Sequence, residues 1–278
     1  MQEKAQQSIN FQRRFGGVAR LYGDQGLQRL RVSHICVIGI GGVGSWVVEA
    51  LARSGVGEIS MIDMDLVAES NINRQIIAGA DTLGRDKVAV MHDRIKNINP
   101  SCQVHCVDEF ISRDNLSTLV NSKMDFIIDC IDDYRIKAAL IHYCKSNKIN
   151  ILTVGGAGGQ IDPSKIRQSD LSRTQHDVLL AKTRKLLRQD YKFPRNLKRS
   201  FSIPCVYSDE QLVFPNGEGG IISQRPSQTS RGDGFNAQDL PNNALNCAGG
   251  LGSITHVTGV FAFFAASHVL NNLIKAEL

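Results

Sequence analysis

The feature that most constrains the fold is a glycine-rich segment, Gly39-Ile-Gly-Gly-Val-Gly44, which stands between two apolar runs. Residues 32–38 are rich in β-branched side chains and predict a buried parallel strand, whereas residues 43–54 carry apolar side chains at helical spacing. Residues 58–62 form the next predicted strand, which ends at Asp63. Strand, glycine turn, helix, strand and terminal acid together predict a βαβ unit that binds a phosphate at the start of its helix.

Strands and helices continue to alternate up to about residue 160. The predicted elements are a helix over 85–98, a strand over 103–107, a strand over 126–130, a helix over 134–146 and a strand over 149–154. This alternation predicts an α/β fold of the Rossmann-like, doubly wound type, a mainly parallel sheet with helices on both faces. We expect the 278 residues to form a single domain with its core at 13–160.

The composition changes after residue 162. Between Lys165 and Ser200, eleven Lys and Arg stand against three Asp, a local net charge of +8 in a chain whose total is +5. Residues 162–200 therefore predict a basic helical insert, and residues 208–246, rich in Gly, Ser, Asn, Gln and Pro, predict a mobile loop. Residues 254–275 predict a buried or interface helix. Because their longest apolar stretch is much shorter than the roughly 20 residues of a membrane span, membrane association is the minor alternative.

Cysteine usage and the polar N-terminus predict a reduced, cytoplasmic protein. The seven cysteines (36, 102, 106, 130, 144, 205 and 247) are odd in number and form no CxxC pair, so no zinc is expected. Residues 1–10 lack the basic-then-apolar layout of a signal peptide. Cys205 and Cys247 lie where a thioester nucleophile would be sought, and burial as small apolar groups is the favoured interpretation.

Further motifs bring charged and amide side chains to the glycine turn. The candidate ATP-binding residues in this part of the chain are Gly39, Gly41, Gly42, Gly44, Asp63, Asp65, Asn71, Asn73, Arg74 and Lys87. Asp63 stands where an acid binds ribose hydroxyls, and Asp65 points to the same side of an extended backbone. Arg74 offers a bidentate clamp for phosphate oxygens, with a surface ion pair as the alternative. A cation at the start of a helix, such as Lys87, calls for an anionic ligand, with an exposed lysine as the alternative.

Three carboxylates, Asp129, Asp132 and Asp133, crowd the end of the strand over 126–130. Their mutual repulsion is costly unless a cation shares them, so we predict Mg²⁺ at this strand end. Capping of the following helix by Asp132 or Asp133 is the alternative. A hydride-transfer cofactor would leave these groups without a role, whereas a nucleotide cleaved between its α and β phosphates uses them. The pattern predicts adenylation.

The basic segment contains a predicted helix over 178–189. The cations selected as candidates for binding a polyanion are Lys182, Arg184, Lys185 and Arg188 on that helix and Arg195, Lys198 and Arg199 after it. A solvated basic face is the usual explanation of such a run. Because the excess is local and the rest of the chain is net acidic, contact with a polyanion is the better explanation.

The motifs GIGGVG, DMD, SNINRQ, GRDKV and DCIDD follow the order and spacing of the ubiquitin-activating-enzyme-like superfamily over residues 13–160. The resemblance implies ATP over the glycine turn with its ribose on Asp63, and Mg²⁺ held partly by Asp132. It implies Arg74, Lys87 and Asp132 as the catalytic residues. It also implies a homodimer in which an N-terminal arginine, Arg14 or Arg20, reaches the partner's ATP. A monovalent cation near the acidic loop and sulfur-transfer or desulfurase partner proteins are further expectations of the resemblance.

The basic segment and the motif CAGGLGSITHVTGVF, which starts at Cys247, are similar to one branch of this superfamily over nearly the whole chain. That branch adenylates the carboxylate of threonylcarbamoyladenosine beside the anticodon of tRNA and cyclises it, releasing AMP and pyrophosphate. The resemblance implies that the seven selected cations bind tRNA. The alternative is adenylation of a ubiquitin-like sulfur carrier, with Cys205 or Cys247 as acceptor, and a NAD-dependent oxidoreductase is the third possibility.

Overall fold

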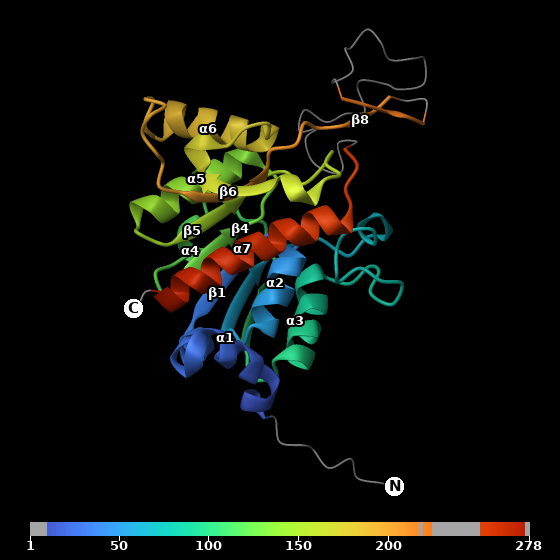
Figure 1. Cartoon of the computed structure of the whole chain (residues 1–278), viewed down its shortest axis with the longest axis vertical. Helices are drawn as coiled ribbons and strands as arrows, with labels where there is room; N and C mark the ends of the chain where they lie inside the picture. Colours follow the sequence, from blue (N-terminus) through green and yellow to red (C-terminus); the bar gives the residue numbers. More distant parts are fainter. Residues whose placement is uncertain (1–9, 217–218, 224–250, 276–278) are drawn as a thin grey trace.

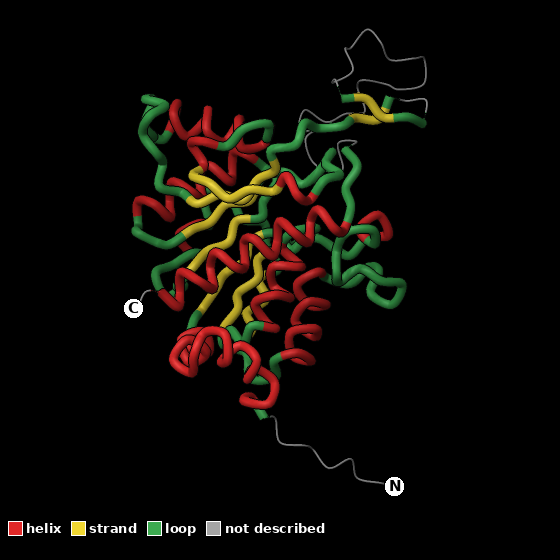
Figure 2. Tube along the Cα trace, viewed as in Figure 1, coloured by secondary structure: helices red, strands yellow, loops and turns green. Residues whose placement is uncertain are grey.

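The computed structural model describes residues 10–216, 219–223 and 251–275, which form a layer of strands between two layers of helices (Figure 1). The central sheet, drawn in yellow in Figure 2, has seven strands in the order β3-β2-β1-β4-β5-β7-β6. All neighbouring strands run parallel except β6, which pairs antiparallel with β7. The doubly wound, mainly parallel α/β fold predicted from the sequence is confirmed.

The strands are short, and those at the centre of the sheet are buried on both faces. Their bounds are β1 His34–Ile38, β2 Glu58–Ile62, β3 Gln103–Val107, β4 Phe126–Asp129, β5 Ile151–Val154, β6 Ile166–Asp170 and β7 Pro204–Ser208. Every residue of β4 and β5 is buried, which explains their continuous apolar sequences.

Helices cover the sheet on both faces. One face carries α1 (Phe11–Val32), α2 (Gly44–Arg53), α3 (Lys87–Ile98) and α7 (Thr255–Lys275), and the other carries α4 (Leu116–Leu119), α5 (Tyr134–Ser146) and α6 (Val178–Asp190). Short 3-10 turns span Glu69–Asn71, Pro163–Lys165 and Leu171–Arg173. Successive residues of β1 serve the two layers, since Val37 packs with the α2 side and Cys36 and Ile38 with the α5 side.

Residues 162–208 contain the basic helix α6 and also contribute two strands to the sheet, β6 and β7, neither of which was predicted from the sequence. β6 is the edge of the sheet, and only its first residue is buried. Its sequence, Ile-Arg-Gln-Ser-Asp, is therefore polar and lacks the apolar pattern from which a strand is predicted. The helix predicted over 178–189 is confirmed as α6, and it packs against α5.

The glycine-rich α1 is not among the predicted elements. Glycine disfavours a helix interior, and Gly23 interrupts α1 with a φ of +76°. The helix nevertheless forms because Phe15, Leu27 and Leu30 are buried against the rest of the protein.

In the predicted mobile loop, β8 (Phe214–Pro215) pairs antiparallel with β9 (Ile221–Ile222), while residues 217–218 and 224–246 lie outside the described residues. The predicted buried helix is confirmed as α7. Its length and composition would allow it to cross a membrane, but 56% of its most apolar window is buried inside the protein. Phe261 and Val269 of α7 are fully buried in the core beneath α2, as in the core helix of a globular protein.

Candidate active site

The glycine turn lies between the end of β1 and the start of α2. Gly39 has a φ of +88°, and a Cβ built on Gly44 would lie 1.8 Å from the carbonyl oxygen of Gly39, so neither position accepts a side chain. The N–H groups of Gly41, Gly42 and Val43 make no hydrogen bond to any described residue. Unpaired N–H groups at the N-terminus of a helix form a site for an anion.

Asp63 holds the glycine turn in place. Its Oδ2 accepts a 2.6 Å hydrogen bond from the Ile40 N–H, and its Oδ1 accepts a 2.8 Å bond from the Asp65 N–H. Burial raises the pKa of the Asp63 carboxyl, and the nearby Lys87 opposes this change. A carboxylate has about four lone-pair positions, so Asp63 retains capacity to bind ribose hydroxyls as predicted.

Lys87 is the first residue of α3, and its side chain is only 6% exposed. Its Nζ lies 2.7 Å from Asp65 Oδ2, and its backbone N–H donates to the Asp65 carbonyl oxygen. The alternative of an exposed lysine is wrong because Lys87 is buried, and Asp65 supplies an anionic partner within the chain. A chain of hydrogen bonds therefore joins the glycine turn through Asp63 and Asp65 to Lys87.

Arg74 lies directly over the glycine turn, since its aliphatic carbons are 3.4 Å from a Cβ built on Gly42. Its Nη1 donates to the Ser70 carbonyl oxygen at 2.6 Å and to Asn73 Oδ1 at 2.9 Å. Asn73 Nδ2 in turn donates to the Ser253 carbonyl oxygen, just before α7. The loop that carries Arg74 is thereby fixed between the glycine turn and the start of α7.

Asn71 helps to shape the loop that carries Arg74. It is 8% exposed, and its Oδ1 accepts a 3.1 Å hydrogen bond from the Ala68 N–H, which shapes the loop around it. Asn71 and Asn73 thus both make contacts that hold this loop.

Sequence reasoning did not select two residues that support this arrangement. Trp46 Nε1 on α2 donates to the Arg74 carbonyl oxygen at 3.0 Å. Gln75 is 5% exposed, its Nε2 lies 4.0 Å from a Cβ built on Gly41, and its Oε1 has no partner among the described residues. Gln75 could have been selected from the sequence because it is the last residue of the motif that contains Asn71, Asn73 and Arg74.

The three carboxylates of the acidic loop have separate surroundings. Asp129 is fully buried and forms a 2.9 Å ion pair with Lys137, which is also fully buried. Asp133 caps α5 by accepting the Arg135 N–H at 2.6 Å, in agreement with the capping alternative. Asp132 is exposed and makes no hydrogen bond or ion pair within the described residues, which leaves its carboxylate available for a metal ion.

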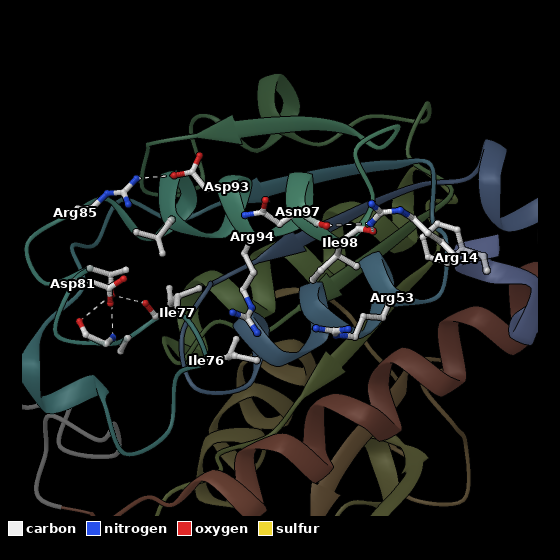
Figure 3. Close-up of a pocket in the computed structure, with 15 residues that line it drawn as sticks. Arg14, Arg53, Ile76, Ile77, Asp81, Arg85, Asp93, Arg94, Asn97 and Ile98 are labelled. Carbon is white, nitrogen blue, oxygen red and sulfur yellow. Dashed lines mark hydrogen bonds and ion pairs between the residues drawn. The ribbon is translucent and has the colours of Figure 1, made fainter. Parts of the chain in front are cut away.

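The two candidate N-terminal arginines differ in their surroundings. Arg14 Nη1 donates to the carbonyl oxygens of Asn97 and Ile98 at 3.1 and 2.8 Å, at one end of a cleft of about 740 Å³ (Figure 3). A cation at the C-terminus of α3 is favoured by the helix dipole, so Arg14 is engaged within its own chain. Arg20 is exposed on α1.

The basic helix α6 begins at the same edge of the sheet as the glycine turn. Its cap, Asp177, accepts hydrogen bonds from Leu180 at 2.8 Å and from Gly156, which follows β5, at 2.9 Å. Burial raises the pKa of the Asp177 carboxyl. Lys182 Nζ lies 5.5 Å from the ring centroid of Tyr134, two residues after Asp132. The first turns of α6 thus adjoin the acidic loop.

Of the seven selected cations, five are open to a ligand or lie at the surface of the acidic loop, and two are engaged within the basic segment. Lys185, Arg195, Lys198 and Arg199 are exposed, and Lys182 is half-buried beside Tyr134. Arg184 differs from the prediction because it is half-buried and hydrogen-bonded to Thr174, and burial lowers its pKa. Arg188 also differs, since it donates to the Pro194 carbonyl oxygen and stacks 5.0 Å from the Phe201 ring centroid. These two arginines hold the segment together.

The fold and the anion-binding turn define a Rossmann-like nucleotide-binding protein, and the chain belongs to the ThiF family, whose model matches residues 13–277. It is 51% identical over 268 residues to a tRNA threonylcarbamoyladenosine dehydratase of Haemophilus influenzae, covering 96% of each chain. The solved structure of Escherichia coli tRNA N6-threonylcarbamoyladenosine dehydratase in complex with ATP is 43% identical, with a TM-score of 0.82 and 96% of each chain covered. The complex of that enzyme with AMP gives a TM-score of 0.81 at the same identity and coverage. The predicted superfamily is confirmed.

Proposed function

We propose that this chain is an ATP-dependent tRNA-modifying enzyme, which adenylates the carboxylate of threonylcarbamoyladenosine and promotes its cyclisation with release of AMP and pyrophosphate. The observation that carries the proposal is the hydrogen-bond chain from the glycine turn through Asp63 and Asp65 to Lys87, at the sheet edge where the basic α6 begins. The extensive similarity to threonylcarbamoyladenosine dehydratases, including one enzyme solved both with ATP and with AMP, supports it.

ATP would lie over the glycine turn, with phosphates on the N–H groups of Gly41, Gly42 and Val43 and ribose on Asp63. Asp132 fits a Mg²⁺ ion because it is an exposed carboxylate beside this turn, and Mg²⁺ binds through one or two carboxylates and substrate phosphates. The ion would withdraw charge from the phosphate oxygens. We further propose a homodimer in which the exposed Arg20, rather than the engaged Arg14, reaches the second ATP.

The reaction needs charge stabilisation at the α-phosphate more than it needs a nucleophile from the enzyme. The threonyl carboxylate attacks this phosphate in line, pyrophosphate leaves, and Arg74 and Lys87 stabilise the charge that develops. The ureido nitrogen of the same modification then attacks the acyl-adenylate, which closes a ring and expels AMP. Because that nitrogen is tethered to the reacting group, its effective concentration is high and no acyl-enzyme is required.

Burial of Cys205, one of the two predicted acceptors, favours this function over activation of a sulfur-carrier protein through an enzyme thioester. Cys205 is fully buried in β7, and burial raises the pKa of its thiol well above the ordinary value. Burial likewise raises the pKa of Cys130 to about 12. Since the thiolate is the nucleophile, neither residue suits acyl transfer. Cys247, the other predicted acceptor, lies outside the described residues.

The proposal is tested by ATP–pyrophosphate exchange with three acceptors in parallel. We expect exchange and AMP release with tRNA that carries threonylcarbamoyladenosine, and neither with the same tRNA lacking the modification, since only the former presents a carboxylate. A ubiquitin-like sulfur carrier is the third acceptor. Exchange with the carrier and not with the modified tRNA would overturn the proposal in favour of the sulfur-carrier function.

The exposed cations of the basic segment lead to a second prediction. The triple variant Lys185→Glu, Arg195→Glu and Lys198→Glu should weaken tRNA binding more than tenfold at low salt, because three phosphate attractions become repulsions. It should also flatten the dependence of log affinity on log salt, while ATP affinity stays unchanged because exposed charges beyond about 10 Å are screened. Filter binding over a salt series measures both quantities.

A matched control reverses three exposed cations outside this segment, Arg113, Lys123 and Lys148. It changes the net charge of the chain by the same amount, so equal losses of tRNA affinity in the two triple variants would contradict a local binding surface. Arg184 and Arg188 are left intact because they make structural contacts.

A further inference from the structure

Three side chains with metal-binding atoms meet on neighbouring strands at the edge of the sheet farthest from β6. His34 is the first residue of β1 and lies in register with Glu58, the first residue of β2, while Ser60 of β2 lies in register with His105 of β3. Because side chains alternate along a strand, His34, Glu58, Ser60 and His105 all point to one face of the sheet, the α5 side.

The ligand atoms of His34, Glu58 and His105 lie within 4.8 Å of one another. Glu58 Oε1 is 3.4 Å from His34 Nδ1 and 2.9 Å from His105 Nε2. A tetrahedral zinc ion with bonds of about 2.0 to 2.2 Å holds its ligand atoms about 3.3 Å apart. Small side-chain rotations therefore suffice to centre an ion between these three groups.

The surroundings of His34 fix its ring in the orientation that a metal ligand needs. Its Nε2 lies 2.8 Å from Ser60 Oγ, so with the proton on Nε2 the Nδ1 lone pair faces Glu58. Its backbone N–H donates to Asp125 Oδ2 at 2.8 Å, and Asp125 is paired with Arg29.

We propose that His34, Glu58 and His105 form a binding site for one zinc-class divalent transition-metal ion per chain. Two imidazoles and one carboxylate are ligands that Zn²⁺ accepts, whereas Mg²⁺ and Ca²⁺ prefer oxygen atoms alone. The side chain of His105 is 50% exposed, so water can fill the fourth position. This site uses no cysteine, so the lack of CxxC pairs in the sequence does not bear on it.

The site is separate from the proposed ATP site. It lies at the N-terminal end of β1, and the glycine turn follows the opposite end of this five-residue strand, about 13 Å further along at the rise of a parallel strand. A bound ion would join three strands, including the exposed edge strand β3. Its expected effect is on the stability of this edge and not on the adenylation chemistry.

The proposal is tested by titrating Zn²⁺ into untagged, chelator-treated protein by isothermal calorimetry. We expect one site per chain in the wild type and a loss of affinity of at least about tenfold in His105→Ala and in Glu58→Gln, since even outer-shell changes at metal sites cost 10- to 100-fold. Zn²⁺ should raise the melting temperature of the wild type and not that of His105→Ala. Both substitutions lie at an exposed or half-exposed position, and circular dichroism without metal confirms that each variant is folded.

Two control variants separate this site from adventitious binding. His92→Ala removes a partly exposed histidine whose partner among the described residues is Asp93, and Cys106→Ser removes the exposed thiol on β3. Both should bind Zn²⁺ like the wild type, and a Co²⁺-loaded wild type should lack thiolate charge-transfer absorption. A wild type that binds no Zn²⁺, unchanged affinity in His105→Ala, or loss of binding in either control would overturn the proposal and leave a hydrogen-bonded His–Glu–His cluster.

Discussion

Lys87→Ala and Asp132→Asn should each lower the rate of tRNA-dependent AMP formation by about a hundredfold or more, the usual effect of removing one oriented charge from a site of charge development. Lys87 is held rigidly by Asp65 at one end of the hydrogen-bond chain to the glycine turn. Asp132 is the carboxylate of the acidic loop that remains available for Mg²⁺. The measurement is single-turnover AMP release with saturating ATP and modified tRNA.

Neither substitution should unfold the protein. Without Lys87 the charge of Asp65 stays solvated, because its side chain is 56% exposed, and Asp132 makes no hydrogen bond or ion pair within the described residues. Arg85→Ala is the matched control for Lys87, since Arg85 lies two residues earlier and pairs with Asp93 at the surface. Asp133→Asn is the control for Asp132, because asparagine still caps α5. Normal turnover in Lys87→Ala, or an equal loss in Arg85→Ala, would contradict the role assigned to Lys87.

The parts of the fold with strong local signals were predictable from the sequence. The boundaries of β2, β3 and α5 agree with the predicted ranges, and the Gly39–Gly44 turn lies where the βαβ pattern places it. These elements combine a regular apolar period with a clear end, such as Asp63 after β2 or Asp133 before α5. The chemical types of the site residues were predictable for the same reason, because they follow strand ends that meet at one edge of the sheet.

Pairings between distant residues were not predictable, since one sequence does not reveal which charges meet. The Asp129–Asp133 cluster suggests mutual repulsion, yet Asp129 is neutralised by Lys137, which stands inside the otherwise ordinary sequence of α5. Arg184 suggests a solvated cation, yet it turns inward to Thr174. The edge strand β6 could not be predicted either, because its backbone pairing with β7 needs few apolar side chains.

The buried Asp129–Lys137 pair leads to the largest expected effect on stability. Both side chains are 0% exposed, and the pair is completed by Thr153 Oγ1, which donates to Asp129 Oδ2 at 2.7 Å. Lys137→Met removes the positive charge and leaves the carboxylate buried without its counter-ion, so we expect the free energy of unfolding to fall by about 3 to 5 kcal/mol. Urea denaturation monitored by circular dichroism measures the loss as a lower transition midpoint at unchanged slope.

A second substitution separates the loss of the charge pair from the loss of packing. In Asp129→Asn with Lys137→Met, the amide can still accept the Thr153 hydrogen bond and no unpaired charge is buried, so this double variant should recover much of the stability that Lys137→Met loses. Lys123→Met, at an exposed position, should stay within about 0.5 kcal/mol of the wild type. Equal instability of the single and double variants would mean that the volume and hydrogen bonds of Lys137, rather than its charge, hold the strand end beneath the glycine turn. Recovery in the double variant would instead identify Asp129 as an acid whose charge is neutralised inside the core, which leaves Asp132 as the carboxylate of this loop available to a metal ion.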